Sequence, residues 1–191
     1  MSNESSHSRI ELLSAEEISQ VAVDLGIPPE LLDRNIFRAL YRSPRIAKAV
    51  QQLLYVHLYG SELDDRLREL VIMRIGWLTK CDYEWTQHWF TAIDPFGCTA
   101  EDLLAVRDWQ ASTHLGVLEK SVLAATDEIV NSGAISDVTW QLCREHLSSE
   151  QACLELITAI ATWHAISLVL RSLRVPLEKG TSSWPPDGVA P

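Results

Sequence analysis

Apolar residues recur with a helical period of about 3.6 residues through most of this chain, and alternating runs of β-branched residues are scarce. Glycine and proline, which most often interrupt a helix, gather near the two ends and at a few interior points. No stretch therefore has the pattern of a sheet strand, and we predict an all-α fold. The expected helices cover residues 15–24, 29–41, 44–59, 62–79, 83–92, 100–109, 116–132, 137–145 and 149–173.

The domain organisation follows from the length and from where the periodicity stops. A chain of 191 residues suits one domain with a substantial core. We expect a single helical domain over residues 14–179. The polar residues 1–13 are expected to form a flexible N-terminal segment, and the aperiodic residues 180–191 an extended or disordered C-terminal tail.

The charge balance narrows the expected partners. Sixteen Lys and Arg against 26 Asp and Glu leave a formal net charge of −10. Nucleic acids and anionic membrane surfaces attract proteins through clustered cations, so we expect neither as a partner. A small-molecule substrate is the partner that we expect instead.

Other features predict a cytoplasmic protein. The N-terminus has no charged region followed by an apolar run, so no secretory signal is expected. Glu155 and His164 interrupt the apolar stretch 154–170, which favours a buried helix over a membrane span. The cysteines have no Cys-x-x-Cys spacing, which favours a reducing compartment and argues against a structural zinc site. They are Cys81, Cys98, Cys143 and Cys153.

The most informative segment is residues 68–88. Glu84 and His88 are four residues apart on a predicted helix and so share one face, and Cys81 extends that stripe by one turn. A carboxylate beside an imidazole can hold its tautomer and tune it for acid–base chemistry near neutral pH. Glu69, on the preceding helix, reaches the same place if the two helices pack antiparallel. We predict a catalytic group of Glu69, Cys81, Glu84 and His88.

Seven tryptophans against three phenylalanines is an unusual ratio. Three of the tryptophans, Trp77, Trp85 and Trp89, flank the polar stripe and are predicted to form apolar walls around it. Such walls exclude water and raise the pKa of a carboxylic acid. The alternative is that these tryptophans belong to the core.

The residues of this stripe also have non-catalytic interpretations. Polar pairs at this spacing are common on solvated helix faces, and a lone Cys81 is usually a small buried apolar residue. Glu84 and His88 alone supply too few ligands for a metal, so we expect no metal site.

Several further side chains are candidates for binding the substrate. Arg74 lies within an apolar run and needs a partner, either a substrate anion or an acid such as Glu69. Tyr83 can donate a hydrogen bond into the site. His164 either lines the pocket or is a satisfied core residue. A row of arginines at helical spacing either attracts a carboxylate or forms a solvated basic face: Arg34, Arg38, Arg42 and Arg45.

The sequence resembles the carboxymuconolactone decarboxylase family, which includes the AhpD-like alkylhydroperoxidases. The resemblance rests on Arg68-Glu69-Leu70-Val71-Ile72, on the twelve-residue step from Glu69 to Cys81, and on Cys81-x-x-Glu84-x-x-x-His88. It covers residues 29–180 and implies an AhpD-like helical bundle. It also implies a homo-oligomer (dimer, trimer or hexamer), which suits a short chain with so many apolar helices.

One position departs from the redox relatives. Peroxidase members carry Cys-x-x-Cys-x-x-x-His, whereas Glu84 stands at the second cysteine here. Thiol peroxidase chemistry needs a nucleophilic thiolate and a resolving partner, so the resemblance implies no dithiol mechanism for this chain.

The remaining acid–base residues resemble the decarboxylase side of the family, for which neither a metal nor an organic cofactor is implied. We expect a lyase or isomerase that moves protons next to a carbonyl group of a small oxygenated acid or ketone. His88 would be the general acid/base, with Glu84 as a second acid/base or orienting group. Glu69 would complete the relay and Cys81 would shape the pocket. The alternatives are a peroxide-handling protein that uses Cys81 and a non-catalytic oligomeric binder of small ligands.

Overall fold

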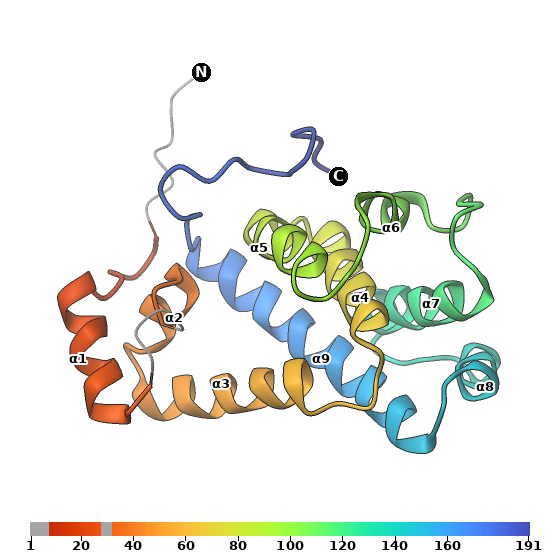
Figure 1. The fold of residues 1–191 in the computed structure, drawn as a ribbon, viewed down its shortest axis with the longest axis horizontal. Coiled ribbons are helices and arrows are strands. Elements are labelled where there is room, and N and C mark those ends of the chain that lie inside the picture. Colours follow the sequence, from red (N-terminus) through yellow and green to blue (C-terminus); the bar gives the residue numbers. More distant parts are fainter. Residues whose placement is uncertain (1–7, 28–31) are drawn as a thin grey trace.

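The computed structural model describes residues 8–27 and 32–191. Over these residues all regular structure is helical and no strand is present, so the predicted all-α class is confirmed (Figure 1). The helices are α1 (Ala15–Leu25), α2 (Asn35–Leu40), α3 (Pro44–Tyr59), α4 (Asp65–Leu78), α5 (Asp82–Ile93), α6 (Ala100–Ala105), α7 (Val117–Ser132), α8 (Asp137–His146) and α9 (Glu150–Leu173), with a short 3-10 helix, η2 (Val106–Asp108), after α6.

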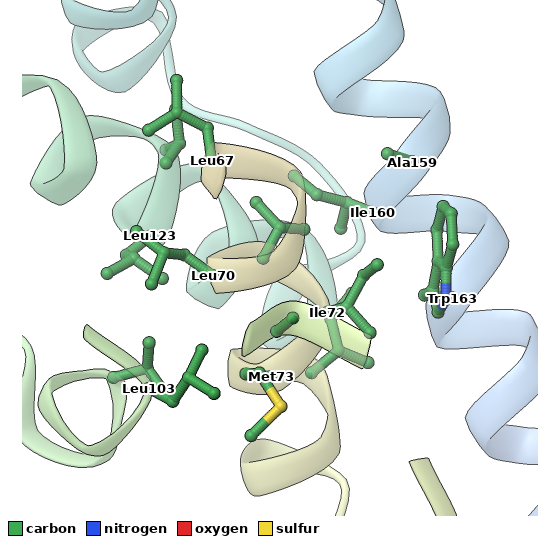
Figure 2. Close-up of a cluster of buried hydrophobic side chains, with 14 of the residues drawn as sticks. Leu67, Leu70, Ile72, Met73, Leu103, Leu123, Ala159, Ile160 and Trp163 are labelled. Carbon is green, nitrogen blue, oxygen red and sulfur yellow. The ribbon is translucent and has the colours of Figure 1, made fainter. Parts of the chain in front are cut away.

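Helix α4 is the centre of the molecule. Every residue from 67 to 76 is buried, on all sides of the helix, because α4 packs against α5, α7 and α9. Figure 2 shows Leu70, Ile72 and Met73 of α4 pointing in different directions, toward neighbours that include Leu123 and Ile160. A helix covered on all sides has no solvent face, so its charged residues must find partners inside the protein.

A second apolar cluster joins the N-terminal helices to the end of α9. It contains Leu32, Ala47, Cys81 and Leu170, whereas the first cluster surrounds α4. Leu54 packs against both clusters. The candidate site lies where the two clusters adjoin.

The turn between α4 and α5 brings these helices unusually close. A Cβ atom at Gly76 would lie 3.1 Å from the backbone nitrogen of Trp85, so a larger residue would require the two helices to move apart by a few tenths of an ångström. Lys80 turns the chain with a left-handed φ of 55°. As a result α5 folds back along α4. This antiparallel packing is the condition under which Glu69 was predicted to lie near Glu84 and His88.

Two predicted helices differ from the structure. The predicted helix over 100–109 divides into α6 and η2, where the carbonyls of Val106 and Arg107 accept hydrogen bonds from the Arg74 guanidinium at 2.8 and 3.1 Å. The predicted helix over 29–41 begins in residues outside those described, and within the described part α2 starts at Asn35.

Both ends of the described chain pack against the domain. Of the predicted flexible segment 1–13, residues 1–7 lie outside the described part; Arg9 N–H donates to the carbonyl of Leu173 at 2.8 Å and Leu13 is buried. The C-terminal arm crosses α5, where the Trp85 indole donates to the carbonyl of Pro185 at 2.8 Å and Trp184 is buried. The expected tail is therefore extended but docked on its own domain.

Helix α9 is long and apolar enough to cross a membrane by composition. One face of α9 packs against α4, α7 and α8 (Figure 1), whereas Leu154 and Leu168 on the opposite side are exposed. The helix expected over the apolar stretch is therefore present, but 44% of its most apolar window is buried.

The buried pair of Arg74 and Asp127 joins α4 to α7 and should stabilise the fold. Arg74 Nε and Nη2 donate to the two Asp127 oxygens at 2.6 and 2.7 Å. Because Arg74→Ala leaves this carboxylate without its cation, we expect the free energy of unfolding to fall by about 3 kcal/mol in urea denaturation. The exposed Arg45→Ala should change it by less than about 0.5 kcal/mol. Equal stabilities of the two variants would contradict this role.

Candidate active site

Glu84 and His88 lie on one face of α5 and line an internal pocket of about 250 Å³. The pocket lies between α2, α3, α5 and α9. Its walls are mainly apolar and aromatic, with a few polar groups. The lining residues are Arg34, Ile36, Phe37, Gln51, Leu54, Tyr55, Leu58, Tyr59, Tyr83, Glu84, Gln87, His88, Thr91, Trp163, Ile166 and Leu170.

Glu69 of α4 holds one side of the His88 ring. Its Oε2 atom lies 2.8 Å from His88 Nδ1. The other oxygen, Oε1, accepts hydrogen bonds of 3.3 Å from Nε and Nη2 of Arg68. Glu69 and Arg68 are completely buried. Arg68 also pairs with Asp65 at 2.5 Å, so its guanidinium balances the buried Glu69 carboxylate only in part. The structure brings Glu69 and His88 together as the sequence predicts.

Trp163 of α9 holds the other side of the ring. Its indole Nε1–H donates to His88 Nε2 at 3.2 Å. An indole nitrogen can only donate, so Nε2 is the unprotonated nitrogen and Nδ1–H donates to Glu69. His88 thus has one defined neutral tautomer, with the lone pair of Nε2 on the side of the pocket wall.

Glu84 is an acid without charge compensation. It is buried, and burial raises its pKa well above the ordinary value of 4.5. Ser167 of α9 donates a short hydrogen bond to Oε2, which opposes that shift only in part. Burial therefore favours the protonated form of Glu84, and its buried Oε1 atom has no hydrogen-bond partner among the described residues.

Cys81 caps the start of α5 and is buried behind Glu84. Burial, and to a smaller extent the neighbouring Glu84, raise the pKa of the Cys81 thiol to about 12. A thiol in this state contains almost no thiolate at neutral pH. The arrangement suits a packing role near the pocket.

The ring of Tyr83 lines the pocket, while its hydroxyl group makes hydrogen bonds within the protein. The hydroxyl donates to Glu178 at 2.6 Å and accepts from the backbone N–H of Ile36 at 3.2 Å. Burial is the first cause of its raised pKa. Glu178 also accepts hydrogen bonds from Gln87 and from the backbone of Asn35. The tyrosine thus ties α2 and the segment after α9 to the pocket, and its hydroxyl is not a free donor.

Three predicted binding residues lie elsewhere. Arg74 pairs with Asp127 on the side of α4 away from His88. Of the two predicted partners, a substrate anion or an acid of the protein, the acid is therefore the one found. The prediction that Trp77 and Trp85 wall the pocket is wrong, because this face of α5 packs under the C-terminal arm. There the two rings lie 5.3 Å apart and each is within 6.0 Å of Trp184.

Trp89 and His164 are also outside the pocket lining. The Trp89 ring stacks on Trp85 at 6.2 Å in the core. His164 is partly exposed and follows Trp163, the residue of α9 that does reach the pocket.

Of the predicted basic row, Arg34 is the residue that reaches the pocket. Arg38 donates to the carbonyl of Leu13, and Arg42 pairs with Glu11 and Glu17. Arg34 has no carboxylate within ion-pair distance among the described residues, and its hydrogen bond to Thr91 is long, 3.4 Å. Over residues 8–27 and 32–191, it is thus a cation without an ion pair at the rim of the pocket.

The sequence analysis missed Trp163 and Ser167 as site residues. Two signals were present: Trp163 follows Glu155 at the spacing by which Trp77 follows Glu69, and Trp163 and Ser167 share a face of an apolar helix. Over the described residues, no group of three or more His, Cys, Asp and Glu side chains is arranged to hold a metal ion.

One comparison with known proteins matches the segment that carries the predicted catalytic residues. The family model for the carboxymuconolactone decarboxylase family matches residues 44–128, which include Glu69, Cys81, Glu84 and His88. A search of curated proteins gave no significant match.

Several solved structures share the fold. An AhpD-type protein of unknown function from Agrobacterium tumefaciens has 20% identity and a TM-score of 0.67, over 73% of this chain and 95% of its own. A peroxidase-related protein from Silicibacter sp. TM1040 has 14% identity and a TM-score of 0.73, over 95% and 97%. The debrominase Bmp8 in complex with 2,3,4-tribromopyrrole has 16% identity and a TM-score of 0.70, over 91% and 95%.

The identities to these structures are low, so each of them supports the fold alone. The family model adds the motif segment itself, with the buried glutamate and the histidine that contacts it. Together these findings show that residues 44–128 match the carboxymuconolactone decarboxylase family and that the chain has an AhpD-like helical fold.

Proposed function

We propose that this protein is a cofactor-independent acid–base lyase or isomerase that acts on a small oxygenated organic acid or ketone. The comparisons support, more coarsely, an enzyme or redox protein of this family. Decarboxylation, dehydration and double-bond migration share a proton transfer at a carbon next to a carbonyl group. The same residues can serve each of these reactions.

The observation that carries the proposal is the pairing of two unlike groups in one pocket. Glu84 is a buried acid whose pKa is raised, with a free Oε1 atom. His88 is held by Glu69 and Trp163 in a tautomer whose Nε2 atom is a proton acceptor. A carboxyl group that stays protonated beside a neutral imidazole supplies an acid and a base at one pH.

The proposed step uses each group once. His88 Nε2 takes a proton from the carbon next to the substrate carbonyl, while Glu69 stabilises the imidazolium that forms. The carbonyl oxygen gains negative charge, and Glu84 then donates its proton to the intermediate. Apolar walls such as Phe37 and Leu58 keep water away from the reacting atoms.

Two features suit the proposed substrate. The pocket volume of about 250 Å³ limits the ligand to a small molecule. Arg34 at the rim would bind an acid group by charge-assisted hydrogen bonds.

We also propose a homo-oligomer, either a dimer, a trimer or a hexamer. Two tyrosines of α3 that line the pocket are also exposed, with 62% of Tyr55 and 65% of Tyr59 accessible. Exposed apolar side chains that gather in one region are typical of subunit contacts.

Substitution of the two acid–base residues tests the proposal. Purified protein is incubated in D₂O with small 3-oxo acids, unsaturated ketones and hydroxylated lactones, and C–H exchange and product formation are followed by proton NMR. We expect His88→Gln and Glu84→Gln each to lower the rate about 100-fold or more, since each removes one proton-transfer group. The exposed residues His146 and Glu145 give the control variants His146→Gln and Glu145→Gln, which should retain the rate. Turnover within a few-fold of wild type in both site variants would remove these roles.

The thiol-dependent alternative makes the opposite prediction for Cys81. Because the pKa of the buried thiol is about 12, we expect native Cys81 to react slowly with a disulfide reagent and to become reactive only on unfolding. Thiol counts before and after alkyl hydroperoxide treatment, with Cys81→Ser for comparison, measure this. Rapid peroxide reduction that disappears in Cys81→Ser would favour the redox function.

A further inference from the structure

Trp163 occupies an unusual position for a core tryptophan. Its ring is buried in α9, yet it lines the pocket, and its Nε1–H points at the proton-accepting nitrogen of His88. The His57 ring lies against it at 5.5 Å and the His88 ring at 6.0 Å, both edge-on. The indole is therefore fixed between two imidazoles, with its one polar group directed to the site.

The hydrogen bond between Trp163 and His88 fits only the neutral imidazole. When His88 takes a proton on Nε2, two N–H groups face each other and the indole loses its acceptor. A buried N–H without an acceptor costs free energy, so the indole needs another acceptor at that moment. In the proposed reaction, the substrate oxygen gains negative charge in the same step.

We infer that Trp163 is a catalytic hydrogen-bond donor whose indole N–H passes from His88 Nε2 to the substrate oxygen as the proton leaves carbon. This inference rests on the proposed acid–base function and names the group that stabilises its anionic intermediate. The interaction strengthens only as charge develops, which is the condition under which a hydrogen bond accelerates a reaction.

The step balances without an oxidant or reductant. The C–H bond next to the carbonyl breaks, the proton bonds to His88 Nε2, and the electron pair forms a carbon–carbon double bond. The carbonyl π electrons move onto oxygen, which accepts the Trp163 N–H. Glu84 supplies the next proton. The charged and titratable groups around His88 are Glu69 with Arg68 from α4, Glu84 from α5, and His57 from α3 behind the indole.

The inference can be tested without knowing the substrate, with 4-nitrophenolate as a planar oxyanion and 4-nitrotoluene as its uncharged counterpart. With ¹⁵N-labelled tryptophan, the Trp163 indole proton should move downfield when 4-nitrophenolate binds and not when 4-nitrotoluene binds. Trp163→Phe should weaken binding of the phenolate about 10-fold more than binding of 4-nitrotoluene, because a hydrogen bond to a charged group is lost. Trp140→Phe, on α8, is the matched control and should bind both probes as wild type does.

Three results would overturn the inference: an unmoved Trp163 indole signal, equal weakening for the two probes, or failure of wild type to bind the phenolate. The wild-type indole signal decides the question even if Trp163→Phe folds poorly.

On a substrate whose C–H group the wild type exchanges, Trp163→Phe should lower kcat about 100-fold with KM within a few-fold. If His88→Gln abolishes exchange and Trp163→Phe does not, the inference about Trp163 fails while the proposed acid–base function stands. If wild type exchanges nothing while the probe pattern holds, the proposed function fails and the donor assignment stands.

Discussion

The structure depends on the burial of α4 on all its sides. Three charged side chains, Arg68, Glu69 and Arg74, are carried into the interior, and each has to be compensated there. Arg74 finds Asp127 and joins α4 to α7. Arg68 pairs with both Asp65 and Glu69, and the remaining oxygen of Glu69 is directed to His88. One helix thus supplies both a structural ion pair and the fixed end of the candidate proton relay.

Glu84 is buried like Glu69, but burial affects its pKa differently. Glu69 has an arginine beside it, whereas Glu84 has the hydroxyl of Ser167 and no cation, so desolvation dominates its pKa. The two glutamates near the pocket therefore have different roles because their surroundings differ. In the redox relatives that the motif resembles, the position of Glu84 is a cysteine, and here Cys81 is left as a buried thiol with its pKa raised. Burial accounts for the raised pKa of both Glu84 and Cys81.

Much of this could be predicted from local sequence. Apolar periodicity located most helices, and the step from Glu69 to His88 across a tight turn predicted their contact. The wrong prediction concerned Trp77 and Trp85, because periodicity does not tell which neighbour covers each face of α5, and here the C-terminal arm covers this one. Trp163 and Ser167 were missed since they lie 75 and 83 residues from their partners in the sequence. Local spacing places Trp163 and Ser167 on one face of α9, but it does not tell which helix that face packs against.

The proposed chemistry requires that Glu84 is a neutral acid in the folded protein. This can be measured by ¹³C NMR of glutamate-labelled protein, with the Glu84 carboxyl signal assigned through its absence in Glu84→Gln. We expect this carbon to stay in its protonated position at pH 7 and to titrate well above 4.5. Because the folded pKa then exceeds the unfolded one, the unfolding free energy of wild type should also fall relative to Glu84→Gln as pH rises from about 4.5 toward the folded pKa. A Glu84 carbon that titrates near 4.5 would contradict the account.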